Sequence, residues 1–529
     1  MLRIAVAAAI ALFAASPVSA MQPDVVPLTV AQGLLAGTHE EDIAVFKNIP
    51  FAAPPVGPLR WRAPQPAPSW TGVRAADRFG PACPQAKGSL FRRLLMPQTE
   101  QSEDCLSLNV WTSRPDAGAK LPVMVFIYGG SFVTGSASFP LYDGTDLAKH
   151  GVVVVTLNYR LGALGFFDHP ALAAESPQEP TGNYGLMDQI AALEWVKRNI
   201  AAFGGDASNV TIFGESAGGM SVNDLMVSPR ARGLFAKAIS ESGLGFNLPS
   251  STGTAQAAAK SFAELSGARG DDAAALARLR SLSTSEIIKQ QAQVAAFRTI
   301  GPIIDGTILP EIPSIAFAKG QIAKVPYMAG SNSNEATLMD ALGTSKDDLL
   351  RPLGDPEDAV RKVYEEYGPL ADDAFTRRLF DDAWFAAPAQ ALAQFATGAG
   401  APAYVYQFAY LTEQQRKDGA DGVMHGGELA YVFGLRGLLN DPFYGSYVKA
   451  ATANDLSVVA RVQAYWTNFA KSGNPNGDGL PQWDATAPAS PKTLVIDNDG
   501  TKTVAGFRKA QLSLIDAAWS KYTRLPAPN

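Results

Sequence analysis

The stretch "VTIFGESAGGM", Val210–Met220, places a serine between two glycines where a short apolar run ends. The residues before the motif have strand character, and those after it suit a helix. A serine at such a sharp strand-to-helix turn stands exposed at the edge of a sheet. Side chains at 214 and 218 would clash with neighbouring backbone, so both positions need small residues. The stretch therefore predicts a nucleophile elbow with Ser216 at its tip.

Other short apolar runs predict the sheet to which this elbow belongs. They are continuous rather than alternating, which is typical of strands buried on both faces. Such strands indicate an α/β fold with a mostly parallel central sheet flanked by helices. The predicted strands are Pro122–Tyr128, Val152–Leu157, Val210–Phe213, Lys237–Ser240, Val325–Gly330, Tyr404–Tyr410 and Thr493–Asp497.

Helical patterns lie between these runs. Apolar residues recur at helical spacing from Leu186 to Ile200, and Gly204 stands where a helix would end. Two alanine-rich helical stretches, near 255–298 and 340–400, interrupt the alternation. We expect them to be insertions that form a cap over the sheet, not independent domains.

The first twenty residues have the composition of a leader. Arg3 precedes an apolar stretch from Ile4 to Ala15, and small residues surround a cut after Ala20. This pattern predicts a signal peptide over 1–20 and a single mature domain over 21–529. The apolar stretch is too short to span a bilayer comfortably, and no other stretch is long enough to cross a membrane. We therefore expect a secreted or periplasmic protein without a stable membrane anchor.

Charge and cysteine content exclude several kinds of partner. The formal net charge is -6 and there is no basic run, so nucleic acid is not an expected partner. Neither of the two cysteines, Cys83 and Cys105, has a neighbouring histidine, and no metal or organic cofactor is signalled. In an exported chain the pair predicts a disulfide.

A serine nucleophile needs a base and an orienting acid, which in this fold follow in the order serine, acid, histidine. Of the four histidines, His425 alone follows Ser216, so elimination selects it as the base. The acid should lie on a loop after a core strand. Glu335 is favoured by its polar turn, with Asp340 and Asp305 as alternatives.

Backbone N–H groups should stabilise the negative charge that develops on the attacked carbonyl oxygen. Ala217, directly after the predicted nucleophile, is one source. Gly130 and Ser131 in "IYGGSF" follow a predicted strand and are the second.

With these residues and the motifs around them, the sequence resembles the type-B carboxylesterases, which include cholinesterases and bacterial para-nitrobenzyl esterases. The resemblance covers roughly residues 24–520, with the motifs in family order. They are "FKNIPFAAPPVGPLRWRAPQP", "SEDCLSLNVW", "IYGGSFVTGS", "LNYRLGALGF", "GNYGLMDQIAALEWVKRNIAAFGGD", "FGESAGG", "SNSNEA", "HGGELAYVFG" and "YWTNFAKSGNPNG".

The resemblance implies an α/β-hydrolase fold and a serine esterase that works through an acyl-enzyme. It also implies a role for each matching residue. These are Ser216 as nucleophile, Glu335 as acid, His425 as base, Gly130, Ser131 and Ala217 as oxyanion donors, Ser242 as a support for the acid–base pair, a Cys83–Cys105 bridge, and Glu215 and Glu428 as structural hydrogen-bonding groups.

Two departures from the family pattern bear on specificity. The family often has a third glycine where this chain has Ser131, and the added β-carbon should narrow the pocket against esters of bulky tertiary alcohols. The loop between the two cysteines has no tryptophan and carries Arg92 and Arg93. A cation–π site needs an aromatic face without competing positive charge, so choline esters are not expected substrates.

The expected activity is hydrolysis of a small-molecule carboxylic ester without a cofactor. Short-chain and aromatic esters are the first expectation, and larger natural esters remain open. The alternative from another functional class is a catalytically silent binding protein on the same fold. Such relatives typically lose a member of the triad, whereas this chain retains all three.

Overall fold

The computed structural model describes residues 25–86, 100–246, 249–295, 300–366, 368–439 and 445–525. The predicted signal peptide over 1–20 lies outside the described residues, as do Arg92 and Arg93.

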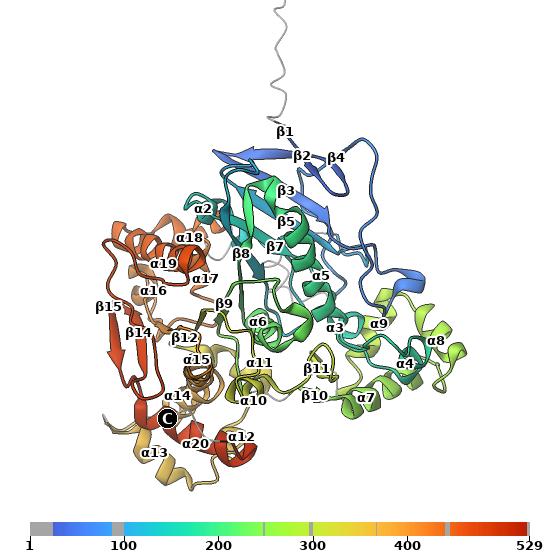
Figure 1. Cartoon of the computed structure of the whole chain (residues 1–529). Helices are drawn as coiled ribbons and strands as arrows, with labels where there is room; N and C mark the ends of the chain where they lie inside the picture. Colours follow the sequence, from blue (N-terminus) through green and yellow to red (C-terminus); the bar gives the residue numbers. More distant parts are fainter. Residues whose placement is uncertain are drawn as a thin grey trace, which may run out of the picture.

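In the described part of the chain, 13 strands form one mixed sheet, which Figure 1 shows with helices around it. Its central strands lie side by side in the order β7-β6-β8-β9-β12-β13-β14, and all run parallel. The predicted parallel sheet is therefore confirmed. These strands are β6 (Leu121–Ile127), β7 (Val153–Leu157), β8 (Gly205–Glu215), β9 (Lys237–Glu241), β12 (Tyr327–Asn332), β13 (Ala403–Phe408) and β14 (Lys492–Asp497).

Further strands extend the sheet at both edges, and the sequence pattern did not predict them. They run antiparallel to their neighbours, except β4, which pairs parallel with β2. Several are only half buried, as in β1, where buried and exposed residues mix. Such strands lack the continuous apolar run that marks a strand covered on both faces. They are β1 (Val26–Val30), β2 (Gly33–Glu40), β3 (Ile43–Pro50), β4 (Val73–Ala75), β5 (Ser107–Thr112) and β15 (Gly500–Ala505), and a separate pair is formed by β10 (Ser250–Ser251) and β11 (Ile303–Ile304).

The predicted central helix is α5 (Tyr184–Asn199), continued by a short 3-10 turn over Ile200–Phe203. Gly204 ends it with φ 82°, a left-handed conformation that glycine adopts without steric cost. The predicted helix and its stop are therefore confirmed. Other helices around the sheet are α2 (Thr145–Ala148), α3 (Gly162–Gly165), α4 (Pro170–Glu175), α6 (Ala217–Val227), α10 (Pro313–Ala318), α16 (Glu413–Lys417), α17 (Leu429–Val432), α18 (Gly445–Lys449), α19 (Ala453–Ser472) and α20 (Lys509–Thr523).

Both alanine-rich stretches contain helices, which Figure 1 shows at the end of the molecule opposite the N-terminal strands. Buried aromatic and aliphatic side chains from the second stretch and from α20 form an apolar cluster of their own. The division into a leader and a single domain with insertions stays a prediction. The helices are α7 (Thr252–Leu265), α8 (Ala273–Arg280) and α9 (Thr284–Gln291) in the first stretch, and α11 (Met339–Leu342), α12 (Lys346–Leu350), α13 (Glu357–Tyr364), α14 (Asp372–Asp381), a π-helical turn (Asp382–Ala386) and α15 (Ala387–Gly398) in the second.

Within the described ranges, no helix combines the length and the apolar character needed to span a bilayer.

Candidate active site

The predicted site residues follow the carboxyl ends of neighbouring parallel strands. Ser216 follows β8, Ser242 follows β9, and Glu335 lies three residues beyond the end of β12. His425 lies in the loop between α16 and α17, in the segment that follows β13. Because β8, β9, β12 and β13 are adjacent in the sheet, their carboxyl ends meet at one edge. The sheet order therefore brings together residues that are far apart in the sequence.

Ser216 occupies the sharp turn between β8 and α6, with φ 57° and ψ -123°. This strained conformation is sparsely populated by residues with a side chain. A β-carbon on Gly218 would overlap the carbonyl oxygen of Ile127, and one on Gly214 would lie 2.6 Å from the carbonyl carbon of Gly218. The prediction that side chains at 214 and 218 would clash with backbone is therefore confirmed.

Replacing Gly218 with alanine should destabilise the protein strongly, because the backbone of Ile127 and Tyr128 would have to move away from the new methyl group. We expect the free energy of unfolding in urea to fall by about 3 kcal/mol. Gly253→Ala is the matched control, since the nearest atom to its β-carbon would be 3.9 Å away, on a helix. That change should be neutral or slightly stabilising. Equal urea midpoints of unfolding for Gly218→Ala and Gly253→Ala would contradict the expected clash at position 218.

Glu335 and His425 form a close pair. Glu335 Oε2 lies 2.6 Å from His425 Nδ1. The Glu335 side chain is fully buried, and that of His425 is 10% exposed. The backbone N–H of His425 donates to Thr337 Oγ1 at 3.1 Å, which ties the histidine loop to the turn that carries the glutamate.

The two alternative acids lie elsewhere. Asp305 Oδ1 accepts hydrogen bonds from the backbone N–H groups of residues 307, 308 and 309, at 2.8–2.9 Å, and so closes its own turn. Asp340 is exposed in the first turn of α11. Of the three candidates, the structure places Glu335 against the histidine.

Ser242, which only the family resemblance singled out, contacts the same carboxylate. Its Oγ donates to Glu335 Oε1 at 2.6 Å, and the backbone N–H of Asn332 donates to the same oxygen at 2.7 Å. Each oxygen of Glu335 therefore has a fixed partner, which holds the carboxylate in one orientation toward His425.

The other ring nitrogen of His425 faces the residue before Ser216. Nε2 lies 3.0 Å from Glu215 Oε1, although the geometry is not that of a hydrogen bond. The imidazole thus stands between two carboxylates. Burial lowers the pKa of His425, but the negative charges of Glu215 and Glu335 outweigh it and raise the pKa well above its usual value.

Two further buried glutamates stand near Glu215. Residues 215 and 241 pair in the parallel register of β8 and β9, so the residues that end the two strands are neighbours. Glu241 accepts a hydrogen bond from the indole of Trp466, and Glu428 accepts one from the side-chain amide of Asn332. Burial is the main cause that raises the pKa of Glu241, and burial also raises the pKa of Glu428 to about 8.

Glu241 is a site residue that the sequence reasoning did not single out. Its signal is positional, because it precedes Ser242 as Glu215 precedes Ser216. The predicted structural role of Glu428 is consistent with its hydrogen bond to Asn332. The raised pKa of His425 depends on how close Glu215 and Glu335 lie in space, which no local sequence pattern states.

The predicted oxyanion loop follows β6 and packs against Ser216. A β-carbon on Gly129 would lie 2.8 Å from Ser216 Cβ, so the two backbones approach closely. Gly130 has φ 111°, and a β-carbon there would overlap the carbonyl oxygen of Thr134. Ser131 is exposed with φ 55°. Ala217 is the first residue of α6, where backbone N–H groups have no partner within the helix.

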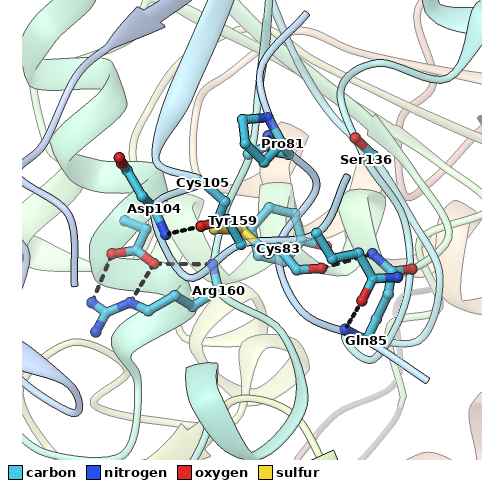
Figure 2. The surroundings of a disulfide bond; sticks show 12 residues. Pro81, Cys83, Gln85, Asp104, Cys105, Ser136, Tyr159 and Arg160 are labelled. Atoms are coloured by element: carbon cyan, nitrogen blue, oxygen red, sulfur yellow. Dashed lines mark hydrogen bonds and ion pairs between the residues drawn. A yellow bond between two sulfur atoms is a disulfide. The ribbon is translucent and has the colours of Figure 1, made fainter. Parts of the chain in front are cut away.

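The disulfide supports this loop. Cys83 and Cys105 are bonded, with an S–S distance of 2.02 Å, which confirms the predicted pair. Figure 2 shows Gln85 beside the disulfide. Gln85 donates to the carbonyl oxygen of Gly135 at 2.8 Å and accepts from Thr134 Oγ1 at 2.6 Å. Closing a loop with a sequence separation of 22 residues should stabilise the fold by about 3 kcal/mol.

No group of three or more His, Cys, Asp or Glu side chains in the described ranges has the arrangement of a metal site.

Residues 24–515 match the model of the Carboxylesterase family. The chain belongs to the carboxylesterase family. It is similar to the fumonisin B1 esterase of Sphingopyxis macrogoltabida, with 37% identity over 89% of this chain and 86% of that protein. The para-nitrobenzyl esterase of Bacillus subtilis is also 37% identical, over 90% of this chain and 95% of its own length.

A solved structure of a PNB esterase is similar in fold. It covers 92% of this chain and 99% of its own, with a TM-score of 0.78 and 33% identity. The α/β-hydrolase fold and the family expected from the sequence are therefore confirmed. As a carboxylesterase, the chain is a carboxylic ester hydrolase.

Proposed function

We propose that this carboxylesterase hydrolyses its ester through Ser216, His425 and Glu335 by way of an acyl-enzyme. The observation that carries the proposal is the 2.6 Å contact between Glu335 Oε2 and His425 Nδ1. This contact holds the proton on Nδ1 and leaves Nε2 as the basic nitrogen. Because Nε2 faces Glu215, the residue joined to Ser216, it is directed toward the nucleophile elbow.

In the first half of the reaction, Ser216 Oγ attacks the carbonyl carbon of the ester and His425 Nε2 takes the serine proton. The tetrahedral intermediate collapses when the imidazolium returns this proton to the leaving alcohol. In the second half, a water molecule gives a proton to Nε2 and attacks the acyl-enzyme. Collapse of that intermediate releases the carboxylic acid and restores the serine.

The N–H groups of Gly130, Ser131 and Ala217 stabilise the oxyanion in both intermediates. Support for this role comes from the close packing of the loop after β6 against Ser216 and from the position of Ala217 at the start of α6. Each such donor contributes about 3 kcal/mol in the transition state.

The pH dependence of hydrolysis should show the influence of Glu215, the carboxylate beside His425 Nε2. His425 must be neutral to accept a proton, so kcat/KM falls as the pH drops through the pKa of this histidine. Because Glu215 raises that pKa, Glu215→Gln should lower it and move the acidic limb of the profile to lower pH. The measurement is kcat/KM from pH 5 to 9, with the exposed Glu264→Gln as control. If the acidic limb of the Glu215→Gln profile does not move, Glu215 does not raise the pKa of His425.

The proposed substrates are small-molecule carboxylic esters, with short-chain and aromatic esters first. The relative named for fumonisin B1 supports testing larger esters as well. The proposal places the protein in the periplasm or outside the cell. It rests on the sequence of the leader, and a disulfide suits an oxidising compartment.

The test is hydrolysis of p-nitrophenyl butyrate by the mature protein, together with labelling by a small fluorophosphonate. Turnover, with the label located on Ser216, is the expected result. Labelling without turnover would show a reactive serine whose pocket rejects this ester, and a screen of acyl chain lengths would follow. A folded protein that neither turns over nor labels would overturn the assignment of Ser216 and favour the silent binding protein.

A further inference from the structure

A cavity with a volume of about 420 Å³ borders the loop that carries His425. Met424 and Gly427, on either side of the histidine, line it together with parts of α16, α17 and α19. The volume lies within the range of small-molecule sites in proteins, roughly 300–1,000 Å³. The cavity is distinct from the oxyanion loop and the nucleophile elbow, because the described residues that line it come from other segments.

The walls are mainly apolar. Aliphatic side chains from the histidine loop, the segment after α17, α18 and α19 face this space, so an occupant with an apolar body would be removed from water. These side chains are Val423, Leu435, Leu438, Val448 and Val459.

The charged groups of the lining are all acidic. Asp418, Asp421 and Asp455 line the cavity, and no lysine or arginine does so in the described part of the chain. Asp421 and Asp418 are both exposed at the rim. Asp421 accepts a hydrogen bond from Asn334 and lies 3.9 Å from Arg377, and Asp418 accepts one from Gln414 at 2.9 Å. Burial opposes the charge on Asp455, but hydrogen bonds from Thr452 and Tyr410 hold its pKa below the usual value. The lining therefore favours a cation over an anion.

Two tyrosines, Tyr431 and Tyr447, line the same cavity. Tyr431 is 5% exposed and lines the cavity, and its hydroxyl makes no hydrogen bond with any described residue. That oxygen is closed off from the cavity, so an occupant meets the rest of Tyr431 together with Tyr447, and aromatic rings attract an ammonium group.

The cavity adjoins both members of the acid–base pair. Asn334, which lines it, directly precedes Glu335. Thr337, which also lines it, accepts the backbone N–H of His425. An occupant would therefore touch residues that position the acid and the base without touching either side chain.

We propose that this cavity is a second ligand site, which binds a hydrophobic amine in its protonated form and whose occupancy changes ester hydrolysis through the His425 loop. The second half of this statement rests on the proposed function of Ser216, Glu335 and His425. The binding itself does not.

Binding is tested by titration calorimetry of the mature protein with 4-phenylbutylamine at pH 7, beside its anionic counterpart 4-phenylbutyrate. We expect the amine to bind and the carboxylate to bind at least tenfold more weakly. Asp418→Lys should weaken amine binding about tenfold, because it reverses a charge at the rim. Asp478→Lys makes the same change of net charge at another exposed position and should leave the affinity unchanged.

The coupling is tested by steady-state hydrolysis of p-nitrophenyl butyrate at several amine concentrations. A change in kcat that vanishes in Asp418→Lys is the expected result. Equal binding of amine and carboxylate, equal affinities of the two lysine variants, or no binding would overturn the site. Purely competitive inhibition would place the amine in the catalytic pocket, and located binding with unchanged kinetics would overturn the coupling. If the protein proves inactive on esters, calorimetry still decides the binding.

Discussion

Ser216→Ala is expected to lower kcat for p-nitrophenyl butyrate by about a millionfold, because no other group of the site can form the acyl-enzyme. Alanine has a β-carbon like serine, so the strained turn with φ 57° should be kept. The residual rate would come from the oxyanion donors and from binding alone. The measurement is steady-state hydrolysis together with the loss of fluorophosphonate labelling.

The control for this variant is Ser261→Ala, which removes an exposed hydroxyl from α7. Its kcat and labelling should equal those of the parent protein. Circular dichroism and the urea midpoint should be unchanged in both variants. A Ser216→Ala protein that keeps a tenth of the parent activity would reassign the nucleophile.

Glu335→Gln is expected to lower kcat about ten-thousandfold. Glu335 Oε1 accepts from Ser242 and from the backbone N–H of Asn332, so the amide oxygen should take that side. The amide NH2 would then point at His425 Nδ1, where a carboxylate oxygen stands now. A donor at Nδ1 selects the tautomer with the proton on Nε2, and that nitrogen could no longer accept the proton of Ser216.

Asp340→Asn and Asp305→Asn are the matched controls, because the sequence left both as alternative acids. Asp340 is exposed, and its replacement should leave kcat within about twofold. Asp305 closes a local turn, so its replacement should lower stability before it lowers kcat. A larger loss of kcat in either control than in Glu335→Gln would move the acid to that residue.

Much of the fold could be predicted because its strongest signals are local. The buried parallel strands are continuous apolar runs, and the glycines at 214 and 218 accompany a turn in which a β-carbon has no room. The half-buried edge strands, such as β1 and β2, have no run of that kind and were missed. When the two faces of a segment differ in burial, whether the segment forms a strand depends on the strands beside which it packs.

The sequence by itself determined the nucleophile elbow, the central parallel strands and, by elimination, the single histidine after the serine. Only the tertiary structure decided which carboxylate meets that histidine, and that Glu215 faces its other nitrogen. Glu335 and His425 are separated by 90 positions in the chain. Their contact depends on the order in which β8, β9, β12 and β13 assemble. Strand order is set by the packing of whole elements, so local patterns of residues do not encode it.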